Sequence, residues 1–232
     1  MARLPRFDIP GISQHVVQRG NNRLPCFLDD HDRRRYLAML SEALTATGCQ
    51  LHAYVLMDNH AHLLATPDRP GAISMMMQRL GRRYVAEFNR RHGRTGTLWE
   101  GRFKSSLVDS SGYVIACYRY IELNPVRAGM VSEPEAFQWS SHAANAHGRT
   151  DPLLTPHPCY RALAEEPQAC AEIYRAIVRQ MVSDDETDRI RLQLRQQRAL
   201  GSESFRKMVE AKTRQFARTR GPQTGSGSLQ EK

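Results

Sequence analysis

Two histidines, His60 and His62, stand two residues apart after an apolar run that ends at Met57. In a β-strand, alternate side chains project from the same face, so both imidazoles can bind one divalent ion. Further along, Tyr120 and Asn124 lie one helical turn apart in a predicted helix, which brings a phenol and an amide to a single spot. Two imidazoles on a metal ion, beside a tyrosine, are sufficient to cut a phosphodiester.

A short series of strands and helices must position these residues. Strand patterns cover His15–Arg19, Leu51–Met57, His60–Ala65 and Phe103–Val108. Helical stripes start after Asp29, after Gly71 and after Asp109, and Pro125 ends the last of these near Asn124. The order β-α-β-β-α-β-α predicts an α+β fold, a ferredoxin-like antiparallel sheet with its helices on one face.

The pattern changes near residue 132, and a mostly helical C-terminal segment follows. We predict three parts: a catalytic domain over residues 1–132, a helical basic domain over 133–220, and a disordered tail over 221–232. Between Arg189 and Arg220, ten basic residues against two acidic ones give a net +8 of the chain's +9. This charge indicates a polyanionic partner such as DNA. A solvated helical bundle without DNA contact is nearly as well supported.

The five cysteines show no C-x-x-C spacing, and their count is odd. The N-terminus lacks the apolar stretch of a signal peptide, and no run approaches the roughly 18 apolar residues that span a bilayer. These features predict a reduced, cytoplasmic protein without a membrane partner.

Four segments within residues 5 to 135 resemble the HUH single-tyrosine transposases, and among them the REP-associated tyrosine transposases. The segments are Val16–Asn21, Met57–Leu64, Leu98–Ser105 and Tyr118–Gly129. Four motifs in the correct order are far more specific than the histidine pair alone. Ala61 departs from the bulky hydrophobic residue usual between the histidines, which affects packing more than catalysis because its side chain points away from the metal.

The resemblance implies a metal-dependent endonuclease and strand transferase with the HUH nuclease fold. Tyr120 would be the nucleophile that forms a 5′-phosphotyrosine, and His60, His62 and Asn124 would hold Mg²⁺ or Mn²⁺. The implied substrate is single-stranded DNA with a hairpin from repetitive extragenic palindromes (REP). The chain would act as a monomer or a homodimer.

Five residues are candidate DNA contacts. Arg102 and Lys104 alternate on a predicted strand beside Trp99, which suits phosphate contact combined with base stacking. Arg19 and Arg127 belong to the segments that carry the resemblance. The alternative for Arg102 and Lys104 is a solvated strand face.

The sequence also fits other interpretations of these residues. The histidines also fit a solvent-facing pair on an edge strand, Tyr118 competes with Tyr120 as nucleophile, and Asn124 before Pro125 suits a helix C-cap. At the level of function, the alternatives are a domesticated palindrome-binding protein that does not cleave, and a nickase of the replication-initiator or relaxase type. Those nickases typically belong to larger polypeptides with helicase domains.

Overall fold

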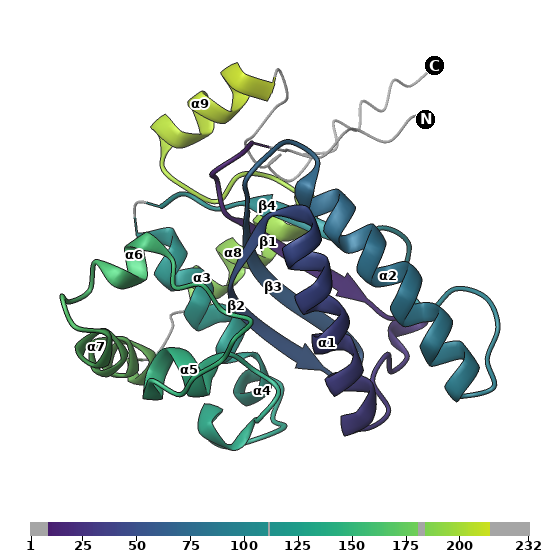
Figure 1. The fold of residues 1–232 in the computed structure, drawn as a ribbon. Helices are drawn as coiled ribbons and strands as arrows, with labels where there is room; N and C mark the ends of the chain where they lie inside the picture. The colour runs from purple at the N-terminus through teal and green to yellow at the C-terminus, as the bar shows by residue number, and fades with distance from the viewer. Residues whose placement is uncertain (1–8, 111, 181–183, 214–232) are drawn as a thin grey trace, which may run out of the picture.

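The computed structural model describes residues 9–110, 112–180 and 184–213 (Figure 1). Its strands are β1 (Gln14–Arg19), β2 (Cys49–Met57), β3 (His60–Pro67) and β4 (Lys104–Leu107). Its α-helices are α1 (Asp30–Thr47), α2 (Ala72–Arg91), α3 (Tyr113–Glu122), α4 (Asn124–Arg127), α5 (His142–His147), α6 (Pro158–Arg161), α7 (Pro167–Arg179), α8 (Asp184–Gln196) and α9 (Glu203–Thr213). Two 3₁₀ turns, η1 (Asn21–Arg23) and η2 (Pro134–Ala136), complete the described elements.

The strands form one antiparallel sheet in the order β2-β3-β1-β4. The two central strands are β3 and β1, and their residues pair from Gln14 with Ala65 to Arg19 with His60. The two-residue turn at Asp58 and Asn59 joins β2 to β3. This is the predicted ferredoxin-like α+β sheet, and the prediction is confirmed.

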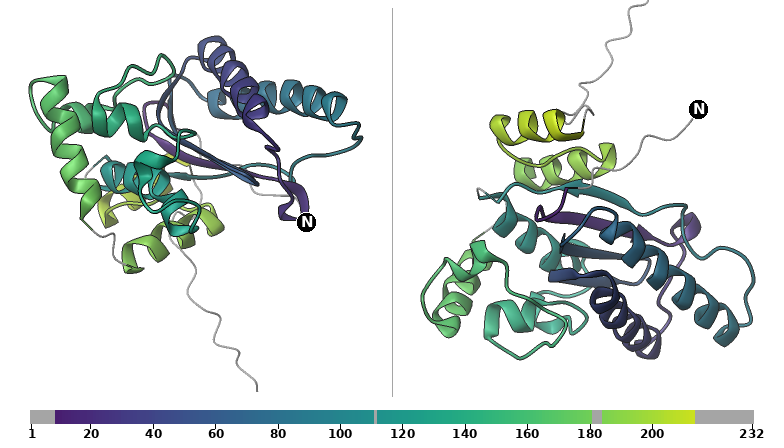
Figure 2. Two further views of the ribbon diagram at one scale, coloured as in Figure 1. Left: turned by 90° about the horizontal axis from the view of Figure 1, so that it is seen from below. Right: turned by 45° about the horizontal axis from the view of Figure 1, so that its top comes forward.

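Helices α1 and α2 cover one face of the sheet, as predicted (Figure 2, left). The carboxylate of Asp29 caps α1 by accepting a hydrogen bond from the backbone N–H of Asp32 at 3.0 Å. The helix ends at Gly48, whose φ of 69° is accessible to glycine at little cost. The apolar stripe of α2 meets that of α1 over the sheet residues Leu56 and Leu63.

Helix α3 lies on the opposite face, so the prediction that the helices share one face holds for α1 and α2 but is wrong for α3. Sheet residues of the other alternation, such as Val55 and Leu64, pack there with Cys117 and Ile121 of α3. Because the strands are apolar on both sides, the sheet has to be covered twice. Helices α5, α6, α7 and α8 extend this second layer (Figure 2), whereas α9 packs in a separate cluster with Leu107.

The C-terminal segment joins the sheet through backbone hydrogen bonds. The N–H of Leu56 donates to the carbonyl of Trp139 at 2.9 Å, and the N–H of Thr155 donates to that of Leu51 at 2.7 Å. On the far edge, the N–H of Leu200 donates to the carbonyl of Leu107 at 2.7 Å. Contacts of this kind occur both within and between domains, so the boundary at residue 132 stays a prediction.

The mostly helical pattern predicted for this segment is confirmed by α7, α8 and α9, which the two shorter helices α5 and α6 precede. The predicted tail, residues 221–232, lies outside the described residues. None of the helices in the described ranges is long and apolar enough to cross a membrane.

Candidate functional site

Two central strands place four functional side chains on the α3 face of the sheet. Arg19 pairs with His60, and His15 pairs with Leu64, the residue two positions after His62. Directly paired residues of antiparallel strands project from the same face, so His15, Arg19, His60 and His62 share it. The ring centroids of His60 and His62 are 4.9 Å apart, and those of His15 and His62 are 5.0 Å apart.

Hydrogen bonds fix the orientation of both sequence-predicted histidines. His60 Nδ1 lies 2.6 Å from Asn59 Oδ1, which can only accept, so the ring proton is on Nδ1 and the lone pair is on Nε2. His62 Nδ1 lies 2.8 Å from His15 Nε2, which again leaves Nε2 of His62 for another partner. Metal-binding histidines typically have this arrangement, in which one nitrogen is held and the other is available.

His15 is the residue that sequence reasoning missed. It is completely buried on β1, and its Nδ1 has no hydrogen-bond partner among the described residues. Its alternation with Val17 and Arg19 was visible in the sequence, but the pairing that sets it opposite the β3 histidines was not. A buried polar atom without a partner is uncommon in a folded protein, and a water or ion that pairs with it is one explanation.

Burial keeps these imidazoles neutral. It lowers the pKa of His60 to about 4, with a smaller effect from Arg19, and the pKa of His15 to about 3. For His62, burial and the neighbouring His60 and His15 together hold the pKa well below its usual value. Because a metal binds only the neutral imidazole, the pair is in its ligating form at pH 7.

The ring of Tyr120 packs against these histidines from α3. Its centroid is 5.9 Å from that of His62 and 5.6 Å from that of His15. Tyr118, the competing candidate, is buried on another side of the helix, where its hydroxyl accepts a hydrogen bond from the N–H of His157 at 3.2 Å. Burial also raises the pKa of the Tyr118 phenol. Tyr120, rather than Tyr118, therefore packs against His15 and His62.

Arg127 covers the other side of Tyr120. Its guanidinium carbon lies 4.5 Å from the ring centroid, and Nη2 donates to the backbone carbonyl of Tyr120. Burial lowers the Arg127 pKa to about 10, so the group stays charged at pH 7. Its Nε and Nη1 are buried and have no hydrogen-bond partner among the described residues. Two charged donors beside a tyrosine ring suit an anionic ligand such as a phosphate.

Asn124 begins α4, and its side-chain Nδ2 donates to the carbonyl of Tyr120 at 3.0 Å. Asn124 comes just after the end of α3, and this bond to a carbonyl in the last turn of α3 is typical of a residue that caps the C-terminal end of a helix. It also assigns the amide, because only the nitrogen can donate to a carbonyl, and so leaves Oδ1 as the group available to a metal.

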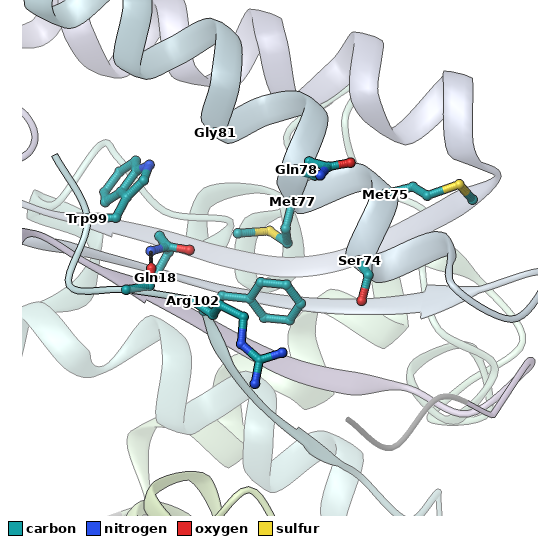
Figure 3. Close-up of a pocket in the computed structure, with 10 residues that line it drawn as sticks. Gln18, Ser74, Met75, Met77, Gln78, Gly81, Trp99 and Arg102 are labelled. Carbon is teal, nitrogen blue, oxygen red and sulfur yellow. Dashed lines mark hydrogen bonds between the residues drawn. The ribbon is translucent and has the colours of Figure 1, made fainter. Parts of the chain in front are cut away.

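The predicted DNA contacts divide between the two faces. Lys104 pairs with Val17 and is exposed on the α3 face, which it shares with Arg19. Arg102 and Trp99 instead line a pocket of about 390 Å³ beneath α2, together with Gln18 (Figure 3). The prediction that Arg102 and Lys104 alternate on one strand is therefore wrong. The physical reason is the turn before β4, where Gly101 has a φ of 66°.

The pocket under α2 is apolar on most sides, with Met75 and Met77 of α2 across from Trp99 (Figure 3). The indole of Trp99 stacks on the ring of Tyr84 at 5.9 Å, and its Nε1 is buried without a hydrogen-bond partner among the described residues. The guanidinium of Arg102 points away from α2 in Figure 3.

The β2-β3-β1-β4 antiparallel sheet thus carries the histidine pair opposite Tyr120 on α3, as the resemblance to single-tyrosine transposases implied. Residues 9–124, half of the chain, match the family described as "Transposase IS200 like". The chain belongs to this transposase family.

A solved structure agrees in fold. The protein described as the REP-associated tyrosine transposase bound to a REP hairpin is 19% identical, with a TM-score of 0.53, over 68% of this chain and 93% of that one. A putative transposase from Deinococcus radiodurans R1 is also 19% identical, over 56% of this chain and 92% of that one, with a TM-score of 0.37. No curated protein matches the chain.

Proposed function

We propose that this transposase is a metal-dependent single-stranded DNA endonuclease and strand transferase that acts through Tyr120 at hairpin-forming, REP-type palindromes. The observation that carries the proposal is the packing of the Tyr120 ring against His62, whose Nε2 is left available by its bond to His15. The substrate class is supported by the relative of like fold, which was solved with a REP hairpin. A protein that acts on such palindromes would work in the cytoplasm.

The donor set fits a divalent ion. His60 and His62 would bind it through Nε2, and Asn124 through its amide oxygen, since the other polar atom of each side chain is already held. Two imidazoles and an amide suit Mn²⁺ somewhat better than Mg²⁺, which prefers oxygen ligands. When bound, the ion would polarise the scissile phosphate as a Lewis acid.

The protein's own groups perform the transfer. The Tyr120 oxygen forms a bond to phosphorus while the bond from phosphorus to the 3′-oxygen breaks, which leaves a 5′-phosphotyrosine and a free 3′-OH. The guanidinium of Arg127 would stabilise negative charge on the phosphate and on the phenolic oxygen through its unpartnered donors. Reversal of the step with another 3′-OH rejoins DNA without a nucleotide cofactor.

Residues on both faces would hold the DNA. Lys104 and Arg19 lie on the face of the tyrosine and suit phosphate contacts. Trp99 lies across the sheet, where the apolar pocket can take an unpaired base beside the indole, and the guanidinium of Arg102 points away from α2 at the rim of this pocket. One chain carries the histidines and the tyrosine, so a monomer suffices, and a homodimer would use the same residues.

A covalent adduct tests the proposal. The protein is incubated with hairpin-bearing single-stranded DNA and Mn²⁺, and the DNA-bound species is sought on a denaturing gel. Tyr120→Phe removes only the hydroxyl and should abolish the adduct, whereas the matched variant Tyr118→Phe should retain it. An adduct that persists in Tyr120→Phe would place the nucleophile elsewhere.

Metal dependence is tested separately. His60→Ala and His62→Ala should each abolish cleavage and leave hairpin binding largely intact, measured by fluorescence anisotropy. Cleavage at the wild-type rate in either variant would remove the ion from the reaction. Hairpin binding by the wild type with no adduct under any divalent ion would favour the non-cleaving palindrome-binding protein instead.

A further inference from the structure

A second group of metal-ligating side chains lies beyond the region of family similarity. Glu135 of η2 faces His142 and His147, which stand at the two ends of α5. Glu135 Oε1 is 3.3 Å from His147 Nε2 and 3.6 Å from His142 Nε2. Ligands 2.0–2.1 Å from a tetrahedral zinc ion are about 3.4 Å apart, so these two separations are compatible with a zinc site. The ligand atoms of all three residues lie within 4.8 Å of one another.

A buried carboxylate orients His142 toward this cluster. His142 Nδ1 lies 3.2 Å from Oε2 of Glu122, and both side chains are almost completely buried. This contact leaves Nε2 facing the cluster, where it is buried and has no hydrogen-bond partner among the described residues. A carboxylate, an imidazole and a metal in that order form the triad that fixes the tautomer of many zinc-bound histidines.

Glu122 is itself held in place. Its two oxygens accept hydrogen bonds from Ser141 Oγ at 2.5 Å, Asn145 Nδ2 at 2.7 Å and the Tyr174 hydroxyl at 2.9 Å. A carboxylate with this many donors cannot turn freely, so the position of His142 is set before any ion arrives. The side chains of Glu135 and His147 are 38% and 29% exposed, which gives an ion access from solvent.

We propose that Glu135, His142 and His147 bind a zinc-type divalent cation at a site distinct from the His60 and His62 pair. Two imidazoles and one carboxylate are a common zinc ligand set, and three protein ligands leave one position for water. The bound ion would tie η2 to α5 and, through Glu122, to the end of α3, where Tyr120 lies. Its role is to stabilise the C-terminal layer.

Cobalt(II) absorption spectroscopy tests the site independently of any DNA-cleavage assay. The double variant His60→Ala/His62→Ala removes the other histidine pair, so the test is independent of the proposed nuclease. This variant should bind one Co²⁺ with a tetrahedral spectrum, and Zn²⁺ should displace it. Zn²⁺ should also raise the melting temperature of the double variant, because an ion that binds only the folded state stabilises it.

Variants at the partly exposed ligands then locate the ion. In the double-variant background, His147→Ala and Glu135→Gln should each weaken Co²⁺ binding by at least about tenfold, the loss typical even of outer-shell partners. His31→Ala, on the exposed side of α1, is the matched control and should change nothing.

Three outcomes would overturn the proposal. One is the absence of Co²⁺ binding, which would identify the cluster as an ion-pair group only. Another is binding that both ligand variants leave unchanged. The third is a thiolate-to-cobalt charge-transfer band, which would place the ion on a cysteine such as Cys159.

Discussion

His15 can set the tautomer of His62, on which the proposed metal binding by His62 depends. If His62 Nδ1 carries the proton and donates to His15 Nε2, then Nε2 of His62 has its lone pair, and the proton of His15 sits on Nδ1. The opposite tautomer would place the proton of His62 on Nε2 and block ligation. In the ligating tautomer the buried N–H of His15 Nδ1 has no acceptor among the described residues, which costs on the order of 1–3 kcal/mol.

The first prediction concerns His15→Ala. This variant should weaken Mn²⁺ binding by about 10- to 100-fold, the usual effect of losing an outer-shell partner of a metal-bound histidine. Isothermal titration calorimetry measures the affinity, and the melting temperature reports any general loss of stability. A His15→Ala protein that binds Mn²⁺ like the wild type would show that His15 does not orient His62.

Among the site residues, the sequence predicts only those whose shared face follows from their spacing along one strand or helix. The spacing of His60 and His62 predicts one shared face, and the strand pairing shows it. The two tyrosines, Tyr118 and Tyr120, could not be told apart by residue type, because their difference arises from what packs around α3. His15 and the Glu122 cluster depend on contacts between distant segments, which no local pattern encodes.

Among the elements, the loop before β4 determines which face of the sheet receives each basic side chain. The turn at Gly101 separates Arg102 and Trp99, at the pocket under α2, from Lys104 on the face of the tyrosine. DNA that follows both sets would pass around the edge of the sheet where β4 lies. The two sets should therefore differ in what they contribute to binding.

Trp99 should contribute by stacking. Trp99→Ala is expected to weaken single-stranded DNA binding by about 1–3 kcal/mol, the range for one stacked base, whereas Trp99→Phe should keep most of the affinity. Fluorescence anisotropy with a labelled hairpin that carries an unpaired flank measures both. Equal losses in the two variants would indicate that the indole supports the fold rather than a base.

Lys104 should contribute through a phosphate. Lys104→Ala is expected to reduce the slope of log K against log salt by about one unit, because one fewer counterion is released. Arg34→Ala, an exposed cation on α1, is the matched control for charge alone and should leave the slope unchanged. A slope that changes equally in both variants would assign the effect to net charge.

The elements themselves could largely be predicted from the sequence. The stripes of α1 and α2 and the alternation in β2 and β3 are local signals, and they give the observed elements within a few residues. Helices α5 and α6 are short, with a single turn or little more each, so propensity alone does not specify them. They form because Ala146 of α5 and Tyr160 of α6 pack with α7 and α3 in the second hydrophobic cluster.

For the molecule as a whole, His52 links the sheet to the C-terminal segment. Its Nδ1 lies 2.6 Å from the carbonyl of Thr155 and its Nε2 lies 2.8 Å from the hydroxyl of Thr66. Burial lowers the pKa of His52 to about 4, and burial also lowers the pKa of the neighbouring His157. Both side chains are thus neutral in the folded protein at pH 7.

This burial predicts a loss of stability in acid. Below pH 6.5 the unfolded state binds a proton at His52 that the folded state does not, so the free energy of unfolding should fall as the pH drops toward 4. The contribution of His52 is about 1.4 kcal/mol per pH unit, or roughly 3 kcal/mol over the whole interval. Urea denaturation across this range measures it, and His52→Gln should show a shallower dependence. An identical dependence in that variant would assign the acid loss to other groups.

The hydrogen bonds of Glu122 limit how the N-terminal and C-terminal parts of this chain can be exchanged with those of a relative. Glu122 ends α3, close to Tyr120 in the chain, yet its hydrogen-bond donors Ser141, His142, Asn145 and Tyr174 all come from residues after the matched family region. Consider a chimaera that joins residues 1–124 of this chain to the C-terminal part of a relative. It would leave the buried carboxylate of Glu122 without hydrogen-bond donors unless the relative supplied four equivalent ones. A change at either side of this junction therefore requires a compensating change at the other.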